Sequence, residues 1–174
     1  MLAHAWNGDD LGDLDLHLID LTGLLNTTTQ MHLAYPVLYY FHSPYRDFAL
    51  APSVIVLDEA FTLIAHRLTR RPGLADTAWH PARAAVDQLL TVVGESVVVP
   101  HADAPPPPVL DQLRERGLPM REPEAFEAAV DELDGRRRLL RGFLAFEGRQ
   151  WPPDAELQAD KQADDRAATS CRRR

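Results

Sequence analysis

The chain has 174 residues, 45% of them hydrophobic, and a net charge of −8 from 26 acidic and 18 basic residues. This length is enough for one domain with a core, and the acidic balance disfavours nucleic acid and anionic lipid as partners. The single cysteine, Cys171, excludes an internal disulfide and a cysteine-based zinc site. No segment has the pattern of a secretory signal or a membrane span, so we expect a chain that resides in the cytoplasm.

The first 25 residues predict a loose N-terminus followed by a helix. Residues 1–12 are polar, with glycine and aspartate. Apolar residues then recur with helical spacing at Leu14, Leu18, Leu21 and Leu25. The segment Asn26 to Thr29 should weaken or end this helix, because its side chains compete for backbone hydrogen bonds.

Residues 31–69 hold a tyrosine-rich segment and a long apolar run, joined by a turn at Ser43 and Pro44. In the first arm, Pro36 predicts a kink, or a new helix with Pro36 in its first turn. In the second arm, Pro52 suits the first turn of a helix whose apolar stripe continues to Leu68. We expect this kinked helical hairpin at the centre of the fold, with the helices 76–95 and 124–147 packed over it.

The rest of the chain predicts helices separated by a proline-rich stretch. Residues 100–108 form a polyproline-like connector, and residues 109–116 form a short helix. Residues 154–174 carry almost no large apolar side chains and should be a disordered tail. The prediction is therefore an all-α domain of about five helices over residues 13–153.

Asp58 is the charged residue that the sequence places in the most apolar surroundings. A buried carboxylate must be paired or protonated. A structural ion pair with Arg46 or Arg83 is favoured over a general acid or base, because no second carboxylate or nucleophile is spaced to assist. The run Arg136 to Arg138 is interpreted as a solvated helix turn, with contact to a partner or to acidic lipid as the alternative.

Neither a metal site nor a catalytic centre is predicted. His32 and His42 would lie about 15 Å apart along one helix, and the sequence holds no known catalytic signature. No cofactor is expected. The aromatic side chains of this segment could form core, a groove or an interface between chains, and they are Tyr35, Tyr39, Tyr40, Phe41, Tyr45 and Phe48. The candidate structural or interaction residues are His32, Tyr35, Pro36, Tyr39, Phe41, His42, Arg46, Asp58 and Arg83.

Three separated segments resemble bacterial potassium-channel-like membrane proteins with two membrane helices around a pore loop. The matching positions are His32, Tyr35, Pro36, Leu38, Phe41, His42, Ser43, Pro44, Leu57 and Asp58, then Arg83 in HPARAAVDQLL, and a closing segment that begins RGLPM. The resemblance covers roughly residues 30–153. The membrane helices and the filter motif of that family do not occur in this sequence, and His42 stands where an arginine is expected.

The resemblance implies a non-catalytic cytosolic regulatory or assembly domain, at the inner face of the membrane if it is attached to a channel. Its expected partners are further copies of the chain or a channel pore domain. Two other functions remain open: a stand-alone helical protein–protein interaction module, and a small hydrolase-type enzyme that uses Asp58 and His42.

Overall fold

The computed structural model describes residues 10–11, 14–40, 49–66, 68, 73–106, 115, 117–118 and 133–151. Within them lie α2 (Leu14–Ala34), the 3-10 helix η1 (Pro36–Tyr40), α3 (Leu50–His66), α4 (Asp76–Ser96) and α7 (Asp134–Phe146). The prediction of an all-α fold is confirmed, and these residues contain no strand. The expected loose N-terminus, short helix 109–116, start of the last helix and disordered tail fall largely or wholly outside the described residues.

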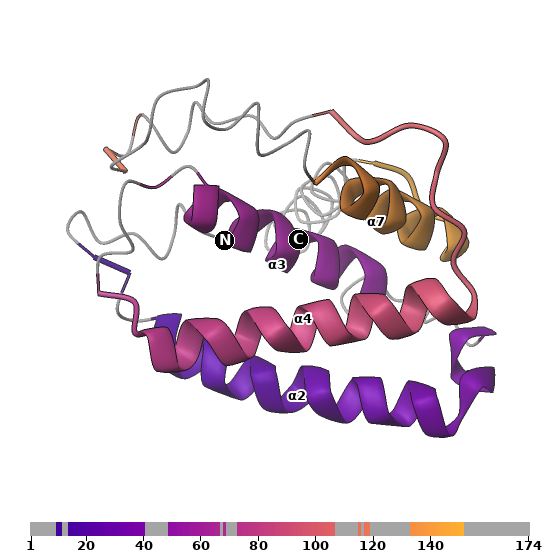
Figure 1. Cartoon of the computed structure of the whole chain (residues 1–174), viewed down its shortest axis with the longest axis horizontal. Coiled ribbons are helices and arrows are strands. Elements are labelled where there is room, and N and C mark those ends of the chain that lie inside the picture. Colours follow the sequence, from indigo (N-terminus) through magenta and orange to yellow (C-terminus); the bar gives the residue numbers. More distant parts are fainter. Residues whose placement is uncertain are drawn as a thin grey trace, which may run out of the picture.

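The helix α4 contacts each of the other three α-helices. Figure 1 shows α4 between α2 on one side and α3 on the other, with α7 beside α3. The strongest of these contacts is between α2 and α4. Among the described α-helices, α4 is therefore the one that contacts all the others; α3, the second arm of the predicted hairpin, contacts α4 and α7, and the turn of that hairpin lies outside the described residues.

The helix α2 continues without a break through the Asn26 to Thr29 segment. The hydroxyl of Thr27 donates to the carbonyl of Gly23 at 2.9 Å, and that of Thr29 donates to Leu25 at 2.8 Å. These side chains bond to carbonyls inside the helix instead of competing with it, and Leu25 and Thr29 are also buried. The prediction that this segment weakens or ends the helix is wrong.

Of the two outcomes expected at Pro36, the new helix with Pro36 in its first turn is confirmed. The helix α2 ends at Ala34, and Pro36 is the first residue of η1. Proline disfavours helical backbone at the residue before it and lacks a donor that an inner helix position needs. A first-turn position avoids both costs.

The core is one cluster of buried side chains from α2, α3, α4 and α7. Eleven of the 17 residues of α3 are buried, and Phe61 of α3 packs edge-on against Trp79 of α4 with ring centroids 5.0 Å apart. The bounds of α4, Asp76–Ser96, agree with the predicted 76–95 within one residue. Its apolar stripe is continuous, which is the pattern that sequence reasoning detects best.

The stretch that follows α4 runs against α7. The amide of His101 donates to the carbonyl of Arg138 at 3.0 Å. A β-carbon at Gly142 would overlap the carbonyl oxygen of Val99 and would lie 3.2 Å from Cα of Pro100. Glycine at position 142 therefore allows the two backbones to touch.

Candidate functional site

Asp58 lies in the middle of α3, and its side chain is only 2% exposed. Arg136 of α7 donates from Nε to both carboxylate oxygens at 3.0 and 3.1 Å, and from Nη2 to Oδ1 at 2.5 Å. Arg83 of α4 donates to Oδ1 at 3.2 Å. Arg83 is one of the two partners that the sequence suggested, whereas Arg46 lies outside the described residues.

A second carboxylate completes this group, which we call the Asp58 cluster (Asp58, Arg83, Asp87 and Arg136). Oδ1 of Asp87 lies 2.7 Å from Nη1 of Arg136 and 3.5 Å from Nε of Arg83. The two carboxylates balance the two guanidinium groups, as buried charges require. The cluster thereby joins α3, α4 and α7 across their contact.

Burial and ion pairing shift the pKa values of Arg83 and Arg136 in opposite directions. Burial lowers the pKa of Arg83, while the charges of Asp58 and Asp87 partly offset that effect. Burial also acts to lower the pKa of Arg136, but hydrogen bonds and charge from Asp58 and Asp87 outweigh it and raise this pKa. Arginine titrates far above neutral pH, so both side chains remain charged in the cluster.

The geometry of the Asp58 cluster fits a structural role better than proton transfer. Both oxygens of Asp58 accept hydrogen bonds from Arg136, which leaves little freedom to exchange a proton with a substrate. Within the described parts of the chain, no three His, Cys, Asp or Glu side chains are placed to hold a metal ion.

Arg137 is also buried, at 4% exposure. It pairs with Glu59 at 3.2 Å and donates to the carbonyls of Pro105 and Pro106 at 3.1 and 2.9 Å. The interpretation of Arg136 to Arg138 as a solvated turn is therefore wrong for the first two. The sequence held a signal: Arg137 lies three residues before the buried Leu140, on the same side of the helix.

The expected aromatic cluster divides into buried and exposed members. Tyr39 is buried, and its ring centroid lies 4.2 Å from that of His32. Burial lowers the pKa of His32 and raises the pKa of Tyr39. Tyr35 is exposed. Of the remaining candidates, Pro36 begins η1, and Phe41 and His42 lie outside the described residues.

The exposed large hydrophobic side chains gather on α2 and η1. Nine of the ten such residues in the described ranges lie between Leu16 and Tyr40. They are Leu16, Ile19, Leu24, Met31, Leu33, Tyr35, Val37, Leu38 and Tyr40. No charged residue occurs from Leu21 to Tyr40. Exposed apolar side chains without nearby charge are typical of surfaces that bind a partner, and the sequence analysis did not identify these residues on α2.

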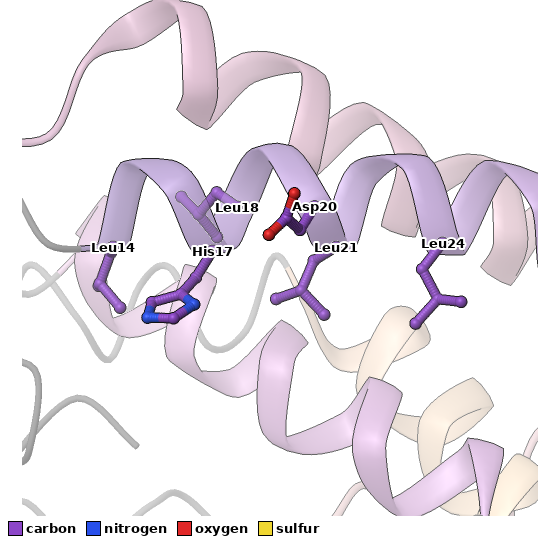
Figure 2. Close-up of a pocket in the computed structure, with 6 residues that line it drawn as sticks. All are labelled: Leu14, His17, Leu18, Asp20, Leu21 and Leu24. Carbon is purple, nitrogen blue, oxygen red and sulfur yellow. The ribbon is translucent and has the colours of Figure 1, made fainter.

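A shallow groove runs along one side of this surface. Figure 2 shows Leu14, His17, Leu21 and Leu24 projecting from the same side of α2. Together with Leu18 and Asp20 they line a groove of about 420 Å³. Its walls are mostly apolar, which suits side chains of a partner better than a charged small molecule.

Comparison with known proteins finds one informative relative. No family model and no solved structure matches the chain. A protein of Bacillus subtilis (strain 168) described as "Uncharacterized membrane protein YdjJ" is 31% identical over 152 residues, which are 87% of this chain and 45% of that protein. The chain thus spans less than half the length of this relative.

This relative corrects two expectations. The resemblance to potassium-channel-like proteins is wrong, because the description of the relative says nothing of a channel and no family model supports one. The expected cytoplasmic location is contradicted, because the relative is described as a membrane protein. In the described part of this chain, no helix is both long enough and apolar enough to cross a membrane.

Proposed function

We propose that this chain is a non-catalytic assembly domain of a membrane-associated protein. The observation that carries the proposal is the concentration of exposed large apolar side chains from Leu16 to Tyr40, where nine of the ten in the described residues lie. The buried core draws on α2, α3, α4 and α7, and these exposed side chains lie outside it. Soluble monomers rarely expose contiguous apolar patches above a few hundred Å² unless the patch binds something.

The tyrosine end, comprising Tyr35, Val37, Leu38 and Tyr40, is the part of this surface that we assign to the membrane. Tyrosine is enriched where membranes meet water, because its ring is apolar and its hydroxyl is polar. Tyr35 is 63% exposed and Tyr40 is 67% exposed. The relative is described as a membrane protein, which supports the same assignment.

The tyrosine end lies beside the ends of two other helices. The ring of Tyr40 is 6.2 Å from that of Phe146, the last residue of α7, and Figure 1 shows η1 close to the end of α4. Val99, which is 82% exposed, follows α4 there. One end of the described structure therefore presents apolar side chains.

Flotation with neutral phosphatidylcholine vesicles tests this proposal. We expect the wild-type chain to float with the vesicles, and the double variant Tyr35→Lys/Val37→Lys to remain at the bottom, because both changes place charge on the proposed contact. The matched control is Ala84→Lys/Gln88→Lys, which adds the same charge on the exposed side of α4. Failure of the wild-type chain to float refutes the membrane contact. The contact is also refuted if the control variant stays at the bottom as the Tyr35→Lys/Val37→Lys variant does.

A second candidate is a protein–protein interaction module that acts away from lipid. The groove along α2, lined by Leu14, Leu21 and Leu24 among others, favours it. The third possibility, an enzyme using Asp58 and His42, draws no support from the Asp58 cluster, because arginines occupy both oxygens of Asp58.

A further inference from the structure

We propose that the charge of His32 controls the attachment of η1 to the end of α2, so that acid releases η1 and strengthens its contact with lipid. In the docked state, which this structure shows, the ring of Tyr39 packs against His32. In the released state Tyr39 has left that contact. This inference rests on the proposed membrane contact, because η1 carries most of the tyrosine end, and it names the regulation of that contact.

Tyr39 is the main attachment of η1. It is the only buried residue of this element, at 3% exposure, whereas Val37, Leu38 and Tyr40 are 37% to 67% exposed. The ring of Tyr40 meets that of Phe146 at its edge but stays largely exposed. The position of η1 therefore depends mostly on what Tyr39 contacts.

The side chain that Tyr39 contacts is a histidine whose inner nitrogen has no partner. The two ring centroids lie 4.2 Å apart, with the planes tilted by 33°. Nδ1 of His32 is buried and makes no hydrogen bond with the described residues. A neutral imidazole can keep this nitrogen free of a proton, but an imidazolium carries a proton on both nitrogens. A buried N–H without an acceptor loses its hydration without return, so the docked state favours neutral His32.

No charge among the described residues opposes this effect of burial. Burial is what lowers the pKa of docked His32. The titratable side chains on the elements packed at this end are three tyrosines, one glutamate at the end of α4 and an ion pair after α7. They are Tyr35, Tyr39, Tyr40, Glu95, Glu147 and Arg149. The tyrosines are neutral at this pH, Glu95 is exposed, and Glu147 pairs with Arg149 at 3.8 Å.

The proton shifts the balance between the two states by a bounded amount. In the released state His32 is hydrated and titrates at about 6.5, the ordinary pKa of histidine. Because the docked pKa is lower, docking is fully favoured above that value and weakens as pH falls toward the docked pKa. A ligand shifts an equilibrium only by its preference for one state. At about pH 5.5, one unit below the ordinary pKa, this preference raises the released population by at most roughly tenfold.

Release adds the ring of Tyr39 to the tyrosine end. An aromatic side chain buries roughly 150–250 Å² when it is fully covered, so the released segment offers lipid a larger apolar area than the docked one. The apparent affinity of a surface rises in proportion to the fraction of chains in the better binding state. Binding to neutral vesicles should therefore strengthen in acid by up to roughly tenfold.

Hydrogen exchange at the Leu38 amide tests the release. This N–H donates to the carbonyl of Tyr35 at 3.0 Å, so its protection reports whether η1 is formed. We expect its protection factor, corrected for the intrinsic rate at each pH, to fall by roughly tenfold from about pH 7.5 to about pH 5.5. Tyr39→Ala should show low protection at both pH values, because it lacks the attachment.

Variants at two histidines of α2 show whether His32 is the group that responds. His32→Phe keeps a ring against Tyr39 but takes no proton, so its protection at Leu38 should be the same at both pH values. His32→Gln, which is also neutral, should behave alike and guards against misfolding by the larger phenylalanine. The matched control is His17→Phe, at an exposed histidine of the same helix, which should respond to acid as the wild type does.

Flotation with neutral phosphatidylcholine vesicles at the same two pH values tests the effect on lipid binding. We expect the wild-type chain to bind more strongly in acid and His32→Phe to bind equally at both pH values. Constant protection in the wild type, a loss of protection in acid that persists in His32→Phe, or release without stronger flotation overturns the inference.

The result for the proposed function is separate. A chain that floats equally at both pH values with constant protection at Leu38 leaves the membrane contact standing and removes its regulation by His32. A chain that loses protection in acid but floats at neither pH removes the membrane contact, and with it the regulation of that contact, although the release of η1 stands.

Discussion

Replacing Asp58 by asparagine should destabilise the fold strongly. The amide keeps the shape of the carboxylate but loses its charge, so Arg83 and Arg136 face each other in a buried site without their main partner. Breaking a buried ion pair by removing one partner costs about 3–5 kcal/mol. Asp87 still lies 2.7 Å from Arg136 and compensates in part, so we expect a value near the lower end, about 3 kcal/mol.

Thermal unfolding followed by circular dichroism measures this effect. For a chain of this length, about 3 kcal/mol corresponds to a fall in Tm of roughly 6–12 °C. The matched control is Asp87→Asn in the same cluster, whose side chain is 48% exposed and which should cost at most about 1 kcal/mol. Equal Tm values for the Asp58→Asn variant and the wild type would show that the cluster does not hold α3, α4 and α7 together.

Two further predictions concern a close backbone contact and a histidine. Gly142→Ala should lower the free energy of unfolding, measured by urea titration, by about 1–3 kcal/mol, because the new β-carbon would overlap the carbonyl of Val99. The control is Gly135→Ala, which should not destabilise the fold, because a β-carbon at position 135 would meet no atom within 4 Å. Burial lowers the pKa of His32 in the folded chain. As pH falls below about 6.5, the ordinary pKa of histidine, the unfolded chain therefore binds more protons than the folded chain. The stability that neutral His32 contributes is lost as pH falls from that value through the lowered pKa of the folded chain. Urea unfolding at several pH values should therefore show less acid destabilisation in His32→Leu than in the wild type; identical pH profiles would contradict this reasoning.

Helix positions were predictable where one apolar stripe runs between clear end signals. The helix α4 follows such a pattern and ends within one residue of its predicted limit. The uninterrupted α2 was not predicted, because threonine hydroxyls can either compete with a helix or bond back inside it, and only the packing of Thr29 against the core decides.

The site was less accessible from sequence because its main contact is distant along the chain. Arg83 lies 25 residues from Asp58, but Arg136 lies 78 residues away, and no local spacing indicates which arginine will reach a given carboxylate. The exposed apolar residues of α2 were missed for a different reason. The apolar positions 14, 18, 21 and 25 explained the helix, so Leu16, Ile19 and Leu24 on its other sides were left without an interpretation.

The arginines of α7 have a consequence for the proline-rich stretch that they hold. Arg137 and Arg141 donate to the main-chain oxygens of Asp103, Ala104, Pro105 and Pro106 and make no hydrogen bond there to a side chain. Every amino acid supplies such an oxygen, so these hydrogen bonds themselves do not restrict residue identity in this stretch. The number of residues in this stretch is restricted by the same hydrogen bonds, because one insertion or deletion would shift each oxygen away from its guanidinium. Variation among relatives should therefore appear here as substitutions at constant length.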